Sequence, residues 1–270
     1  MKTDGGFIRE EYEDEKVSIY VIDIRELDEN LKNTINQFIV SICEGPQEEL
    51  LELEDVKEEI RRFLTEKKPK NNETGKETNT YIGAIAEFFI HLFLNYIGLK
   101  QECLFLNLEE KSIKKGFDGY YSFNGEPFLE TWIMESKSGY INSQNATHKE
   151  KLKTSYKQLK DKITTNDPKV NNPWKNALRH AQIAQSDKNI LKELQKFSQQ
   201  FIRKEINNDI NNFNLIPCST IYYFKDWEEN KENIINEIKH SISELEYRKL
   251  KIICINKKFK KLFLNYLGID

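Results

Sequence analysis

Two short segments carry the side chains with the clearest chemical potential. The first, KGFDGYY from residue 115, places Asp118 between two glycines, and the second, IMESKSG from residue 133, contains Glu135 and Lys137. Side chains alternate along a β-strand, so Glu135 and Lys137 are expected to project from the same face of the second segment. Burying this acid and this base unpaired would be costly, so they must serve each other, a metal or a substrate.

This pattern suits the hydrolysis of a phosphodiester. The attacked phosphate is anionic, so a divalent cation is needed to neutralise charge and to lower the pKa of a bound water. Mg²⁺ takes oxygen ligands and keeps several waters, so two carboxylates suffice to hold it. We expect Asp118 and Glu135 as ligands of Mg²⁺ or Mn²⁺, with the backbone carbonyl of Ser136 as a third. Lys137 would position the attacking water and stabilise developing negative charge.

One local feature opposes a shared metal site. Asn124-Gly125 is a favoured two-residue hairpin turn. A tight turn there would place Asp118 opposite Thr131, about 13 Å from the second acid along the strand. The site therefore requires a wider connection centred near Glu126-Pro127, or a bulge. The proline favours such a connection because it donates no ladder hydrogen bond.

The same residues resemble the PD-(D/E)XK nuclease superfamily. In that superfamily an Asp, a spacer and an acid-X-Lys strand follow a helix that carries another acid. The matching residues here are Asp118, Glu135-Ser-Lys137 and Glu87, the only carboxylate in an apolar helix expected at 81–98. The resemblance implies that Glu87 is a further catalytic acid that could also bind the metal. An acid-X-Lys strand alone usually marks a surface ion pair, so a solvated charge pair is the alternative.

A narrower resemblance rests on residues within about 81–139. The Ala-Glu helix, the Gly-Phe-Asp-Gly segment and the Glu-Ser-Lys strand, after an acidic N-terminal part, are similar to the HamA family. This family is the nuclease component of the bacterial Hachiman anti-phage system. The resemblance implies a metal-dependent DNA nuclease held in check by a helicase partner of the HamB type. Two alternatives stay open: a stand-alone restriction-type endonuclease acting as a homodimer, and a non-catalytic nuclease-like subunit that binds nucleic acid.

Charge divides the chain into two parts. Residues 1–60 hold 18 Asp and Glu against 6 Lys and Arg, and the remaining residues hold 26 against 35. The stretch 67–79, KKPKNNETGKETN, is polar and aperiodic, so we expect a linker there. This organisation predicts an acidic N-terminal strand and helix region at 1–66, suited to partner docking, and a nuclease domain at 80–270. Two solvated surfaces of opposite sign are the alternative.

Hydrophobic periodicity predicts an α/β fold, in which a mixed sheet is flanked by helices. The PD-(D/E)XK resemblance implies that this sheet is a restriction-endonuclease-like core with an acidic N-terminal extension. Strands are expected at about 17–24, 102–108, 115–123, 128–138, 216–224 and 250–255. Helices are expected at about 29–43, 47–64, 81–98, 149–164, 173–185, 187–211 and 228–247. The tail, 257–267, is ambiguous.

Other features narrow the class of protein. The N-terminus shows no signal-peptide pattern, and Glu87 makes 81–99 a buried helix rather than a membrane span. The four cysteines have no metal-ligand spacing, so we expect reduced thiols in a bacterial cytoplasm. No glycine-rich phosphate loop is present, which argues against ATP use. Six lysines between Lys149 and Lys162 would either follow a phosphate backbone or form a solvated face.

Overall fold

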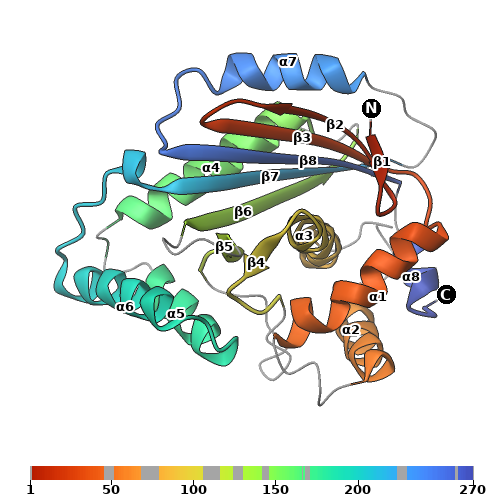
Figure 1. The fold of residues 1–270 in the computed structure, drawn as a ribbon, viewed down its shortest axis with the longest axis horizontal. Coiled ribbons are helices and arrows are strands. Elements are labelled where there is room, and N and C mark those ends of the chain that lie inside the picture. Colours follow the sequence, from red (N-terminus) through yellow and green to blue (C-terminus); the bar gives the residue numbers. More distant parts are fainter. Residues whose placement is uncertain are drawn as a thin grey trace, which may run out of the picture.

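The residues that the structure describes form one eight-stranded sheet with helices on both of its faces (Figure 1). The computed structural model describes residues 2–45, 52–67, 79–105, 116–123, 130–141, 146–165, 167, 171–223, 230–258 and 261–269. The strands are β1 (Lys2–Asp4), β2 (Phe7–Glu13), β3 (Val17–Ile24), β4 (Leu99–Gln101), β5 (Gly119–Phe123), β6 (Thr131–Tyr140), β7 (Asn214–Tyr223) and β8 (Lys249–Lys258). The helices are α1 (Glu29–Glu44), α2 (Leu53–Lys67), α3 (Asn79–Tyr96), α4 (His148–Thr164), α5 (Pro173–Ile183), α6 (Lys188–Arg203), α7 (Lys231–Ser241) and α8 (Lys261–Tyr266), with a 3-10 turn η1 at Ile210–Asn212.

The strand order is β1-β2-β3-β8-β7-β6-β5-β4. The central strands β3, β8, β7 and β6 run parallel, and the pairs at both ends of the sheet are antiparallel. Strands β7 and β8 are buried along almost their whole length, as expected for parallel strands covered by helices on both faces. The expectation of a mixed α/β sheet flanked by helices is confirmed.

Two apolar clusters fill the two faces of this sheet. Trp132 and Met134 of β6 belong to the cluster that contains α3, whereas Ile133 belongs to the cluster that contains α4. This is the alternation expected along a strand, and it leaves Glu135 and Lys137 on the α4 face.

Local signals located most elements well. Strand β3 matches the expected 17–24, and the Asp28 side chain caps α1 by accepting a hydrogen bond from the backbone N–H of Leu31 (2.8 Å). The expected helix at 187–211 is too long, because α6 ends at Arg203 and Lys204 adopts a left-handed conformation with φ 58°. The ambiguous tail contains the end of β8 and then α8.

The hairpin β1–β2 was not predicted. In β2 only Phe7 and Arg9 are buried, and the other residues are charged, aromatic or partly exposed, so the segment lacks a clear apolar alternation. Strand β3, which follows this hairpin, pairs with β8 near the C-terminus. Strands from both sides of the expected linker therefore share one sheet. Most of that linker, residues 68–78, lies outside the described residues, and the docking role of the N-terminal region stays a prediction.

The register of β5 against β6 answers the question raised by the Asn124-Gly125 turn. Gly119 lies opposite Met134, and Ser122 lies opposite Thr131. Opposed residue numbers sum to 253, so the connection is centred between Glu126 and Pro127. Residues 124–129 themselves lie outside the described residues, but a tight turn at Asn124-Gly125 is excluded by this pairing.

Two further expectations concern membrane-spanning helices and the state of the cysteines. Among the described residues, no helix is both long and apolar enough to cross a membrane. All four cysteines lie within the described residues, are buried and form no disulfide.

Candidate active site

Strand β6 presents an acid and a lysine to the same side. The ammonium group of Lys137 donates hydrogen bonds to Oε1 of Glu135 and to the carbonyl oxygen of Ser136, both at 2.8 Å. These contacts follow from the two-residue spacing on an extended strand. The expectation that Glu135 and Lys137 project together is confirmed.

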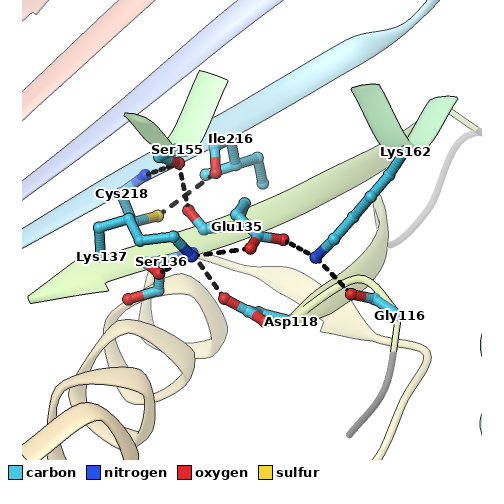
Figure 2. Close-up of polar contacts among 9 residues, drawn as sticks. All are labelled: Gly116, Asp118, Glu135, Ser136, Lys137, Ser155, Lys162, Ile216 and Cys218. Carbon is cyan, nitrogen blue, oxygen red and sulfur yellow. Dashed lines mark hydrogen bonds and ion pairs between the residues drawn. The ribbon is translucent and has the colours of Figure 1, made fainter. Parts of the chain in front are cut away.

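A second lysine, which sequence analysis did not assign to the site, reaches the same carboxylate from α4. The ammonium group of Lys162 donates to Oε2 of Glu135 at 2.5 Å and also contacts the carbonyl oxygen of Gly116. Figure 2 shows Lys137 and Lys162 approaching the Glu135 carboxylate from opposite sides. Both oxygens of one carboxylate are thus held by ammonium groups from two different elements.

Helix α4 is held against β6 by a hydroxyl group two turns before Lys162. Ser155 donates to the backbone carbonyl of Glu135 at 2.7 Å and accepts a 3.3 Å hydrogen bond from the backbone N–H of Cys218 on β7 (Figure 2). Residues seven apart lie on the same side of a helix, so this docking also directs Lys162 toward the strand. No local pattern distinguishes Lys162 from the other lysines of the 149–162 segment, so its role depends on this docking.

Asp118 is the residue just before β5, and its side chain is part of the site. Its Oδ2 accepts a 2.8 Å hydrogen bond from the backbone N–H of Ser136. The side chain thus bonds to a backbone group of β6 at the point where strand β5 begins. Asp118, Glu135, Ser136 and Lys137 are therefore brought together, although the two acids are 17 positions apart in the sequence.

We call Asp118, Glu135, Lys137 and Lys162 the acid–lysine cluster. Their charges affect one another strongly because Glu135 is almost fully buried, with 2% of its side chain exposed. Burial raises the pKa of Glu135, and the nearby charge of Asp118 raises it further, while Lys162 and Lys137 act in the opposite direction. Burial acts to lower the pKa of Lys137, but the charges of Glu135, Asp118 and Glu87 outweigh it, and the pKa is raised. Each group therefore depends on its neighbours for its charge state.

Glu87 lies on α3, which packs on the face of the sheet opposite α4. Its charge acts on Lys137, and its Oε1 lies 3.4 Å from Nε2 of His91, one turn along the helix. His91 is fully buried, and its Nδ1 is hydrogen-bonded to the hydroxyl of Tyr121 on β5. His91 is thus both a core residue and a contact of Glu87.

The oxygen atoms of the cluster have the chemistry that Mg²⁺ or Mn²⁺ requires. Within the part of the chain that the structure describes, no three His, Cys, Asp or Glu side chains gather closely enough to hold a metal ion. Mg²⁺, however, needs only one or two carboxylates with further oxygen ligands. Glu135 Oε1 and the Ser136 carbonyl already converge on one positive charge, that of Lys137. The residues present therefore fit a small, hard cation.

Together, the fold and the cluster define a class of α/β proteins. A mixed sheet carries a buried carboxylate, held by two lysines, on the strand where antiparallel pairing gives way to parallel pairing. The chain belongs to the HamA family, whose model matches residues 6–267, nearly the whole sequence. Membership implies a component of the Hachiman defence system, in agreement with the narrower resemblance of residues 81–139. No curated protein matches the chain.

Proposed function

We propose that this protein is a metal-dependent DNA nuclease of the PD-(D/E)XK type, acting in anti-phage defence. The observation that carries the proposal is the meeting of Asp118, Glu135 and Lys137 at one point of the sheet, in the register that a shared site requires. HamA family membership supports the same conclusion independently of this geometry.

In this proposal each residue of the cluster has a separate role in phosphodiester hydrolysis. A bound Mg²⁺ or Mn²⁺ would neutralise phosphate charge and lower the pKa of a water. Asp118, Glu135 and the Ser136 carbonyl would hold the cation, and Glu87 would be a further acid of the site. Lys137 positions the attacking water and stabilises the negative charge that develops on the phosphate.

Lys162 has a supporting task in this scheme. Its ammonium group holds Oε2 of Glu135 and ties it to the Gly116 carbonyl, so the carboxylate keeps one orientation. A catalytic group gains efficiency when its position is set before the substrate arrives. Lys162 thus orients the acid without needing to touch the substrate.

The proposed partner is a helicase of the HamB type, which restrains the nuclease until foreign or damaged DNA is met. Family membership supports this partner. The acidic N-terminal region, with 18 acids against 6 bases in residues 1–60, offers a surface that suits docking. The proposed substrate is DNA without strong sequence preference, because the sequence shows no separate domain for reading bases.

The proposal is tested by cleavage assays on linear and circular DNA, with and without the helicase partner. Mg²⁺ or Mn²⁺ should support cleavage and EDTA should abolish it. The double variant Glu135→Ala/Lys137→Ala should lose cleavage while retaining its circular dichroism spectrum. The matched control is Lys157→Ala/Asp161→Ala, which removes an exposed acid–lysine pair on α4 with an N–O distance of 2.9 Å.

Two results would contradict the proposal. Full cleavage by the Glu135/Lys137 variant would show that these residues are not the active centre. A wild-type protein that binds DNA but never cuts it, alone or with the helicase, would identify a non-catalytic binding subunit instead.

A further inference from the structure

Helix α6 exposes a row of lysines that neither the cluster nor its chemistry uses. Lys188, Lys192 and Lys196 are all exposed and follow each other at intervals of four residues, which places them on one side of the helix about 6 Å apart. We call these three residues the α6 lysine stripe. Gln195 and Gln199 lie on the same side of the helix and add hydrogen-bonding groups.

The stripe lysines form fewer contacts with acids than other surface lysines do, although the charge of Lys196 acts on Glu193 of the same helix. Like charges one turn apart on a helix repel each other. On α4, Lys157 is paired with Asp161, and Lys160 contacts Glu246. No ion pair joins the three stripe lysines to an acid among the residues that the structure describes. The positive charge of α6 therefore faces outward and is available to an anionic partner.

The inner side of the helix that carries the stripe contacts strand β5, which begins one residue after Asp118. Glu193, on the inner side of α6, accepts a 3.2 Å hydrogen bond from the hydroxyl of Tyr120, two residues after Asp118. Glu193 and Tyr120 line a cavity of about 270 Å³ together with Ile133, two residues before Glu135. Helix α6 thus stands beside both strands that deliver the acids.

Helix α5 and the 270 Å³ cavity described above also link α6 to the strand that follows Asp118. Helix α5 packs alongside α6 (Figure 1), and its Trp174 contacts Phe117 with ring centroids 4.9 Å apart. Phe117 immediately precedes Asp118. The same cavity is also lined by amide and guanidinium side chains: Asn207, Asn208, Asn212, Asn214 and Arg248. Amides and guanidinium groups are common contacts of phosphate and sugar oxygens.

We propose that the α6 lysine stripe binds the phosphate backbone of nucleic acid and guides a strand toward the acid–lysine cluster. This inference rests on the proposed nuclease function and assigns its substrate-binding surface. Lysines that each neutralise one phosphate release condensed counterions, so the affinity they supply depends strongly on salt. The contribution is the same for every base sequence, because it involves the backbone alone.

The test compares the salt dependence of DNA binding in two lysine variants of the full chain. The first, Lys188→Gln/Lys192→Gln/Lys196→Gln, removes the stripe and keeps residues that favour helix. The second, Lys157→Gln/Lys160→Gln, removes two lysines of α4 that are already paired with acids. Binding to a short labelled duplex is followed by fluorescence anisotropy over a range of NaCl concentrations, with EDTA present to stop hydrolysis.

We expect the slope of log affinity against log salt to become shallower by about 2–3 in the stripe variant, close to 0.9 for each lost phosphate contact. Affinity at low salt should fall at least about tenfold. The α4 variant should bind nearly as the wild type does.

Three results would overturn the inference. The first two leave the proposed nuclease function standing, and the third does not. A stripe variant with the wild-type slope and wild-type cleavage overturns the inference and leaves the nuclease function standing. A stripe variant that binds DNA normally but loses salt-dependent binding to the helicase identifies a protein-docking surface instead. A wild-type protein that binds no DNA, alone or with the helicase, overturns both proposals.

Discussion

The backbone N–H of Ser136 donates a 2.8 Å hydrogen bond to Oδ2 of Asp118. This bond joins the residue before β5 to the middle of β6 and sets the position of Asp118 relative to Glu135. The Asp118 charge also raises the pKa of Glu135. The same contact therefore brings two carboxylates together and makes a positive group between them favourable.

The variant Asp118→Asn separates the charge of this residue from its hydrogen bond. The amide oxygen of Asn can still accept from Ser136, so the fold should be retained, with an equal or higher melting temperature because repulsion with Glu135 is relieved. Cleavage in Mg²⁺ should fall by about 100-fold or more, as for the loss of a preorganised charged group. Asp118→Ala, which also loses the hydrogen bond, should lower both cleavage and melting temperature. Wild-type cleavage by Asp118→Asn would remove this residue from the site.

Lys162→Met should destabilise the protein by leaving one oxygen of a buried carboxylate without its ammonium partner. Breaking a buried pair costs about 3–5 kcal/mol. Since 24% of the Lys162 side chain is exposed, we expect a smaller loss, about 2 kcal/mol. Lys162→Arg should recover part of this stability. The matched control is Lys160→Met, which removes a surface contact with Glu246 and should cost about 0–1 kcal/mol. Equal urea midpoints for the Lys162 and Lys160 variants would contradict the structural role of Lys162.

His148 should make the protein sensitive to acid. It is buried between the Ser219 hydroxyl (2.9 Å) and the Asn256 side-chain oxygen (2.8 Å), and burial lowers its pKa to about 4. The unfolded chain takes up a proton near pH 6.5, so stability falls from about pH 6.5 down to pH 4, by about 3 kcal/mol in total. In His148→Gln this part of the pH dependence should vanish. The free energy of unfolding of both proteins, measured from pH 7 to pH 4, checks this, and parallel curves would contradict it.

Lys257 should destabilise the protein at neutral and acidic pH. Its side chain is 1% exposed, and its ammonium nitrogen lies 3.6 Å from the Phe89 ring centroid without a hydrogen-bond partner among the described residues. Burial lowers the pKa of Lys257 to about 7, so stability rises with pH between about 7 and 10.5 as the unfolded lysine alone stays protonated. Lys257→Met should remove this rise and stabilise the protein at pH 7 by about 1–4 kcal/mol. Lower stability of Lys257→Met at pH 7 would show that the ammonium group is favourably held.

Much of the local structure follows from the sequence alone. The alternation of side chains along an extended strand places Glu135 and Lys137 on one face, and the Asp28 cap begins α1 as expected. These features depend on residues a few positions apart, where the geometry of strands and helices leaves few choices. Sequence resemblance also located the family, which the match over residues 6–267 confirms.

Tertiary structure decided which distant groups meet. The tight-turn motif Asn124-Gly125 and the wide connection were both compatible with the local sequence, and the pairing of Gly119 with Met134 selected the second. A strand register is set by the apolar faces that must be buried, which a turn motif does not encode. Among six similar lysines in the 149–162 segment, only the docking of α4 through Ser155 brings Lys162 to Glu135. The orientation of a helix against a sheet arises from contacts between residues far apart in the chain, so no local pattern could have chosen that lysine.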